Sequence, residues 1–152
     1  MYRVNEIMSR DVVCVAPTDT IRHAAQLMQR FDIGVLPVCD GNELIAVVTD
    51  RDLRHYLFRP HVREDIGATS IERLLKAVTV DEIMSAPVLT VDAADDVTDA
   101  ARMMLEDKVG SLPVTEGGRL VGIITETDVL RELCRADAAC SPEVTDIIVS
   151  HR

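Results

Sequence analysis

Short apolar runs and amphipathic segments alternate along this chain in an order that predicts its secondary structure. In the second half, β-branched and other apolar residues are concentrated at 112–114 and 120–124, with a pair of glycines between them. This pattern predicts two strands joined by a tight turn. Thr125 and Asp128 follow at once, and a hydroxyl with a carboxylate three residues later predicts a capping box at the start of a helix.

The same order occurs earlier in the chain, so the sequence contains a repeat. Sliding the sequence by 76 residues aligns 4–57 with 80–133 without a gap, and 20 of the 54 paired positions are identical. Each copy begins with a short helical turn (4–8 or 80–84) and a strand (12–15 or 88–91). An amphipathic helix, two strands and a second helix follow. We therefore predict an α/β (α+β) fold of two β-α-β-β-α repeats packed about a pseudo-twofold axis.

The first helix of each copy has an apolar stripe at helical spacing. The stripe residues are Val97, Ala100, Ala101, Met104 and Leu105 in the second copy, and Ile21, Ala24, Ala25 and Met28 in the first. Thr18 is the predicted N-cap of the earlier helix. We interpret the methionines as core-filling residues.

These elements divide the chain into four parts. Residues 1–58 form the first repeat, 59–79 a linker, 80–135 the second repeat and 136–152 a C-terminal tail. The linker is predicted to be a loop followed by a short helix over 70–75. The tail is predicted to contain a short helix over 144–149, to which we assign no function.

Composition narrows the class of protein. Apolar residues make up 47% of the chain but aromatic residues only 3%, which predicts an aliphatic core. No apolar run approaches the roughly 18 residues of a membrane-spanning helix, and the N-terminus does not resemble a signal peptide. A cytoplasmic protein without membrane contact is therefore expected. The net charge of −10 argues against binding nucleic acid.

Catalytic and metal-binding patterns are not found in the sequence. The four cysteines form no CxxC pair, and the spacing of Cys134, Cys140 and His151 matches no usual zinc pattern, so we interpret the cysteines as reduced structural thiols. No nucleophile–base pair and no P-loop is present, and the four histidines are scattered. The sequence predicts neither an enzyme nor a resident metal.

The repeat does predict a ligand site. Two similar copies that pack about a twofold axis create two related clefts, where strand ends and helix starts offer backbone amides. A carboxylate such as Asp52 or Asp128 can accept hydrogen bonds from the two hydroxyls of a ribose. Arg51 and Lys108 could meet a phosphate. Small residues in or beside the strands would let a planar group approach the backbone; these are Gly34, Ala46, Gly110 and Gly122.

The motifs resemble those of the CBS domain, named after cystathionine β-synthase. The resemblance is carried by VNEIMS and VDEIMS, by GVLPV and GSLPV, and by the G-I-I-T-E-T-D run that ends at Asp128. It covers both copies, so the chain resembles a tandem CBS pair, or Bateman module. The resemblance implies a compact α/β module that commonly forms homodimers through its helices. It also implies adenosine-containing ligands (AMP, ADP, ATP or S-adenosylmethionine) in the clefts between the copies, with no required cofactor.

The resemblance assigns site residues in both copies. Asp128 and Asp52 would bind ribose, Thr125 and Thr49 would lie near ribose or phosphate, and the purine would lie against two backbone segments. The full set is Thr90, Lys108, Gly110, Ser111, Leu112, Pro113, Thr125 and Asp128 in the second copy, and Cys14, Gly34, Val35, Leu36, Pro37, Thr49, Arg51 and Asp52 in the first.

Differences between the copies predict sites of unequal affinity. Cys14 occupies the position of Thr90, and Ala46 that of Gly122, which we expect to weaken a purine contact near Asp52. The position of Arg51 in the first copy is occupied by the uncharged Thr127 in the second. We therefore favour the Asp128 site for adenosine, while Arg51 keeps the Asp52 site open to a phosphorylated ligand.

Two functions remain as alternatives. The first is a non-catalytic sensor that binds an adenine nucleotide and modulates an unidentified partner protein. The second is an oligomerisation or scaffold module whose clefts are vestigial, which Cys14 and Ala46 would explain.

Overall fold

The protein is described by a computed structural model that covers residues 2–58, 68–86 and 88–136. The predicted loop over 59–67 and the predicted helix over 144–149 lie outside the described residues. The described elements are α1 (Val4–Ile7), α2 (Ile21–Phe31), β1 (Val35–Asp40), β2 (Glu43–Thr49), α3 (Asp50–Leu57), α5 (Ala68–Ala77), the 3-10 turn η1 (Val80–Glu82), β3 (Val91–Asp92), α6 (Val97–Asp107), β4 (Ser111–Glu116), β5 (Arg119–Thr125) and α7 (Glu126–Ala136).

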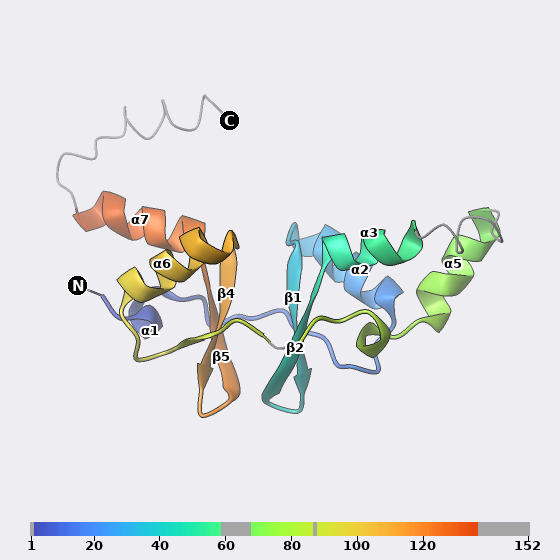
Figure 1. Cartoon of the computed structure of the whole chain (residues 1–152), viewed down its shortest axis with the longest axis horizontal. Coiled ribbons are helices and arrows are strands. Elements are labelled where there is room, and N and C mark those ends of the chain that lie inside the picture. Colours follow the sequence, from blue (N-terminus) through green and yellow to red (C-terminus); the bar gives the residue numbers. More distant parts are fainter. Residues whose placement is uncertain (1, 59–67, 87, 137–152) are drawn as a thin grey trace, which may run out of the picture.

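Two antiparallel hairpins form the centre of the molecule, and the helices lie at its two ends (Figure 1). The strand order is β1-β2-β5-β4-β3, with β3 parallel to β4. Among the described residues, the strands of the two hairpins pair with each other near their turns, where Glu43 is paired with Arg119 and the Leu120 amide donates to the Asn42 carbonyl at 3.1 Å. Farther along, the edges of β5 and β2 pair instead with Ser9 and Ser85. The predicted α/β class and two-repeat organisation are confirmed.

The start of each repeat packs against the other repeat. Ser9 is paired with Ile123 of β5, with both backbone hydrogen bonds at 2.9 Å, and Ser85 is paired in the same way with Val47 of β2. In addition, α1 contacts α7 and β5. We call α2, α3, β1 and β2 together with residues 80–85 the first unit, and α6, α7, β3, β4 and β5 together with residues 4–9 the second unit. Each unit therefore contains the opening segment of the other sequence repeat, and we call these two stretches the exchanged segments.

Each unit has its own aliphatic core. The core of the first unit includes Leu36 and Val48, together with Val80 from the opening segment of the second repeat. The core of the second unit includes Leu112 and Ile124, together with Val4 from the start of the chain. The methionines Met28 and Met104 are buried in these cores, which agrees with their interpretation as core residues.

Helix capping follows the sequence closely after the hairpins. The Thr49 hydroxyl accepts from the Asp52 amide at 3.0 Å, and the Asp52 carboxylate accepts from the Thr49 amide at 2.9 Å. Thr125 and Asp128 form the same box at 3.2 and 2.9 Å. Both predicted capping boxes are confirmed.

Several predicted boundaries are wrong. Residues 12–14 and 88–90 are not strands. In the first copy Val15 forms a single bridge to Val38, and in the second copy β3 has two residues. The stretches before them are connecting segments. The N-cap of α2 is Thr20 rather than Thr18, since the Thr20 hydroxyl accepts from the His23 amide at 3.2 Å. Leu105 belongs to the apolar stripe of α6 but is 80% exposed.

Among the described residues, no helix is both long enough and apolar enough to cross a membrane.

Candidate functional site

A central cleft of about 400 Å³ lies between the two units and takes its walls from both. The first unit contributes the end of β2 and the start of α3, including Thr49 and Arg51. The second unit contributes the stretch from Lys108 to Pro113, which connects α6 to β4 and includes the first residues of that strand. The volume lies in the range of small-molecule sites, about 300–1,000 Å³.

The first-unit wall is built by a strand that runs directly into a helix. The Asp50 amide donates to the Gly34 carbonyl at 2.9 Å, which ties the start of α3 to the segment before β1. The carboxylate of Asp50 is turned toward Arg54, with 3.4 Å between the Arg54 Nη2 and Asp50 Oδ2 atoms. A side chain at Gly34 would contact that carboxylate, because a Cβ there would lie 3.4 Å from the Asp50 Oδ1 atom.

The second-unit wall begins at a residue in an unusual backbone conformation. Lys108 ends α6 with φ of +54°, a left-handed value that L-residues rarely adopt, and its amide donates to the Met104 carbonyl. Asp32 ends α2 in the same way, with φ of +51°. Each of these caps turns the chain from the helix toward the strand that follows.

Asp52 lies on a second cavity, of about 450 Å³, that adjoins the central cleft at Arg51. This cavity is also lined by His55 and Tyr56 of α3 and by Ile83. One oxygen of the Asp52 carboxylate is used in the capping box. The other is 3.5 Å from the Ser85 hydroxyl, which donates to it.

Asp128 lies on a smaller cavity, and its carboxylate already contacts a neighbouring cation. Its cavity is about 120 Å³ and is lined by Glu6, Ile7, Arg131, Glu132 and Arg135. One carboxylate oxygen accepts from the Thr125 amide, and the other lies 3.6 Å from the Arg131 Nη1 atom. A ribose would therefore have to displace Arg131 to use both oxygens.

The structure brings together nine of the sixteen predicted site residues in the central cleft. These are Gly34, Val35, Thr49, Arg51, Lys108, Gly110, Ser111, Leu112 and Pro113. Two of the remaining residues have a cavity of their own, Asp52 and Asp128. Thr90 lines a further cavity of about 310 Å³. Cys14, Leu36, Pro37 and Thr125 line none of these cavities. The cleft joins the Thr-x-x-Asp start of one copy to the Gly-x-x-Pro segment of the other.

The expectation for Gly122 and Ala46 is wrong. A Cβ at Gly122 would lie 2.5 Å from the Met8 Sδ atom and 2.9 Å from the Ser9 carbonyl oxygen, so protein rather than a ligand fills that space. Ala46 is fully buried in the first core. Protein atoms therefore surround both positions, so the exchange of glycine for alanine is not a change in a purine contact.

Sequence reasoning missed four apolar wall residues, Val47, Val88, Leu89 and Val109, as well as Ser85 beside Asp52. Val88 and Leu89 were assigned to a strand, which concealed their position at the cleft. Ser85 did carry a signal, since it is repeated as Ser9 in the first copy.

Of the cysteines in the described residues, Cys39 is buried, whereas Cys14 and Cys134 are exposed, and none of the three forms a disulfide. Cys140 lies outside the described residues. Burial, and secondarily the neighbouring Cys14 thiol, raises the pKa of Cys39 to about 11. Across the described residues, no group of three or more His, Cys, Asp or Glu side chains could hold a metal ion.

Comparisons with known proteins agree with this architecture. A family model described as "CBS domain" matches residues 4–59 and 80–135. The chain is 33% identical over 149 residues to Hypoxic response protein 1 of Mycobacterium tuberculosis, covering 93% of this chain and 96% of that protein. It is 34% identical over 132 residues to the uncharacterized protein MJ1404 of Methanocaldococcus jannaschii, covering 85% of this chain but only 31% of that longer protein.

A solved structure extends the comparison to three dimensions. CBSX2 of Arabidopsis thaliana, in complex with AMP, matches with a TM-score of 0.72 and 27% identity, covering 90% of this chain and 98% of that one. The two matched CBS segments coincide with the two sequence repeats and include most of the chain. The chain therefore belongs to the CBS-domain family and carries two CBS domains in tandem.

Proposed function

We propose that the protein is a non-catalytic regulatory module that binds an adenosine-containing ligand in the central cleft. The observation that carries this proposal is the composition of the cleft walls. Hydroxyl groups of Thr49 and Ser111, the cations of Arg51 and Lys108, and the apolar side chains of Val47 and Leu89 converge on one cavity. Few polar groups on a largely apolar surface are typical of a small-molecule site.

The chemistry of each wall suits one part of a nucleotide. Apolar side chains and exposed backbone can hold a purine. The protein hydroxyls can donate to or accept from a ribose, and the nearby Asp52 carboxylate can accept from its hydroxyls. Arg51 and Lys108 suit a phosphate. The relative CBSX2, described in complex with AMP, supports this class of ligand.

The location of the cleft suggests how binding would regulate a partner. A ligand held by both units stabilises the arrangement in which the two walls are close together. It shifts the equilibrium between arrangements by its difference in affinity for them, and by no more than that. An unidentified partner protein would read the arrangement.

We revise the preferred carboxylate from Asp128 to Asp52. The Asp52 cavity is about 450 Å³ and adjoins the central cleft, whereas the Asp128 cavity is about 120 Å³ and contains the contact with Arg131. A ligand of nucleotide size can reach Asp52 from the central cleft without displacing an ion pair, whereas at Asp128 it would displace Arg131.

Isothermal titration of AMP, ADP, ATP and S-adenosylmethionine tests this proposal. The variants are Asp52→Asn and, as the matched control, Asp128→Asn; asparagine keeps an oxygen acceptor for the capping box. Binding should weaken about tenfold or more in Asp52→Asn, as expected for loss of a charge-assisted hydrogen bond, and change little in Asp128→Asn. Absence of heat with all four ligands would favour the scaffold alternative.

We also propose that the protein forms a homodimer through the second unit. A groove of about 300 Å³ between α6 and α7 is lined by Met104, Val129 and Leu105, and Leu105 is 80% exposed. Leu130 and Leu133 on α7 are 55% and 61% exposed. A groove and a protruding side chain on one face are self-complementary under a twofold axis. The segment 137–152, which follows α7, is the alternative occupant of this face.

A further inference from the structure

The central cleft has a pseudo-symmetric counterpart with opposite charge. The 76-residue offset that relates the two copies maps Arg51 onto Thr127, Lys108 onto Asp32 and Asp50 onto Glu126. The described cleft thus contains two cations and one carboxylate, whereas the corresponding positions on the other side contain two carboxylates and no cation.

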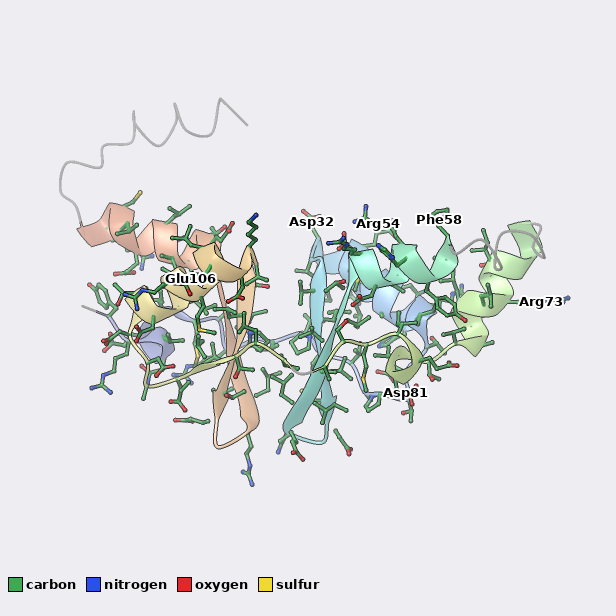
Figure 2. All side chains as sticks on the ribbon, viewed as in Figure 1. Asp32, Arg54, Phe58, Arg73, Asp81 and Glu106 are labelled. Carbon is green, nitrogen blue, oxygen red and sulfur yellow. The ribbon has the colours of Figure 1, made fainter. Side chains whose placement is uncertain are left out.

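The geometry strengthens this difference. In the central cleft, the one acidic side chain, Asp50, is paired with Arg54 at 3.4 Å, so its charge is partly compensated. Glu126, the residue that corresponds to Asp50, lies close to the Gly110 backbone, since a Cβ at Gly110 would be 3.7 Å from the Glu126 Oε2 atom. Figure 2 shows Asp32 at the end of the first unit that faces the second. Acidic groups therefore occupy the counterpart of the cationic wall.

The neutral residues do not separate the two sides, because Ser111 and its counterpart Val35 both line the central cleft. The positions that correspond to Arg51 and Lys108 lack the cations that would bind phosphate oxygens. Folding of the two copies in the same way therefore produces two sites of different chemistry.

We infer that the protein binds one phosphorylated ligand per chain, in the cleft of Arg51 and Lys108, and that the counterpart side excludes phosphate. This inference rests on the proposed function and narrows its ligand class from adenosine derivatives in general to those with a phosphate. Because Arg51 belongs to the first unit and Lys108 to the second, the phosphate is the group that joins the two units. The anion, rather than the nucleoside, then sets the spacing between them.

The first experiment compares AMP with adenosine by isothermal titration of the full chain. One AMP should bind per chain, and at least tenfold more tightly than adenosine, because each charge-assisted contact to phosphate adds affinity. The double variant Arg51→Gln/Lys108→Gln should bring the ratio of the two affinities close to one. Arg102→Gln is the matched control, since this side chain on α6 is exposed and pairs with Asp99 outside the cleft; it should keep the ratio.

The second experiment transfers the charge to the counterpart side. The variant Asp32→Lys/Thr127→Arg should raise the number of bound AMP molecules from one to two per chain. Two equal AMP sites in the unaltered protein, or a preference for AMP that survives in Arg51→Gln/Lys108→Gln, would overturn the inference. Neither result would affect the proposed function, which fails only if AMP, ADP, ATP and S-adenosylmethionine all give no binding.

Discussion

The first and second units have the same backbone plan, but they differ at the positions that face solvent and each other. Both begin a helix with the same Thr-x-x-Asp box, and both end a helix in the left-handed conformation. Yet Leu105 and Leu130 of the second unit correspond to Gln29 and Arg54 of the first. The comparison shows that a repeated core can support two different surfaces, and the apolar one carries our proposal of a dimer interface.

The largest expected effect concerns this difference in helical surface. Leu105→Glu combined with Leu130→Glu should weaken dimerisation by about 100-fold or more, because burying each leucine contributes about 1.5–3 kcal/mol. Analytical ultracentrifugation measures the change. Gln29→Glu, at the matched position of the first unit, should leave the dimer intact. Equal weakening by both changes would remove the distinction between the units.

A mixing experiment sharpens the same comparison by determining the orientation of the dimer. Leu105→Glu and Leu105→Lys should each dissociate the dimer alone, and mixing them should restore it if the second unit meets the second unit of the partner. If the second unit met the first instead, mixing would have no effect.

A chain ending at Ala136 tests the other occupant of the face: dimers of unchanged affinity are expected, and tighter dimers would show that residues 137–152 compete for it.

The next largest effect concerns the exchanged segments. Gly122→Ala should lower the free energy of unfolding by about 1–3 kcal/mol, because the added methyl collides with Met8 and with the Ser9 carbonyl. Denaturant unfolding followed by circular dichroism measures it. Adding Met8→Ala should recover only part of the loss, since the Ser9 contact is backbone. If Gly122→Ala were as stable as the unaltered protein, the exchanged segment would not pack here as described.

A smaller effect separates capping from ligand binding. Thr49→Ala and Thr125→Ala should each cost about 1 kcal/mol, because both hydroxyls satisfy a helix N-terminal amide. Thermal unfolding with and without AMP distinguishes their further roles. The stabilisation by AMP should fall in Thr49→Ala, whose hydroxyl lines the central cleft, and persist in Thr125→Ala. An equal fall in both would contradict the single-cleft proposal.

The smallest effect concerns the two left-handed residues. Asp32→Gly should stabilise the protein by about 0.5 kcal/mol, because relief of the left-handed strain is partly offset by the entropy of glycine in the unfolded chain. Lys108→Gly should have the same effect on stability. Chemical denaturation compares them, and titration with AMP should show weaker binding only for Lys108→Gly. Loss of stability in either variant would mean that the side chain makes a stabilising contact.

Local features could be predicted because each depends on neighbours along the chain. The capping boxes at Thr49 and Thr125 need only residues three positions apart. The glycine turn at residues 117 and 118 has the positive φ values that glycine favours. The buried stripe of α2 follows from helical spacing alone. The exposure of Leu105 could not be predicted, because helical spacing alone does not distinguish a residue that faces the core from one at the edge of the apolar stripe that faces solvent.

The sequence alone determined the duplication, the order of elements and the chemical groups that each copy carries, since these are local properties of the chain. Only the tertiary structure decided which groups meet. The exchange of the opening segments places Met8 and Ser9 against Gly122, and the packing of the two units brings Arg51 of one copy to the cleft that contains Lys108 of the other. These contacts join residues far apart in sequence. Their pairing depends on how two aliphatic cores and the segments between them pack in space.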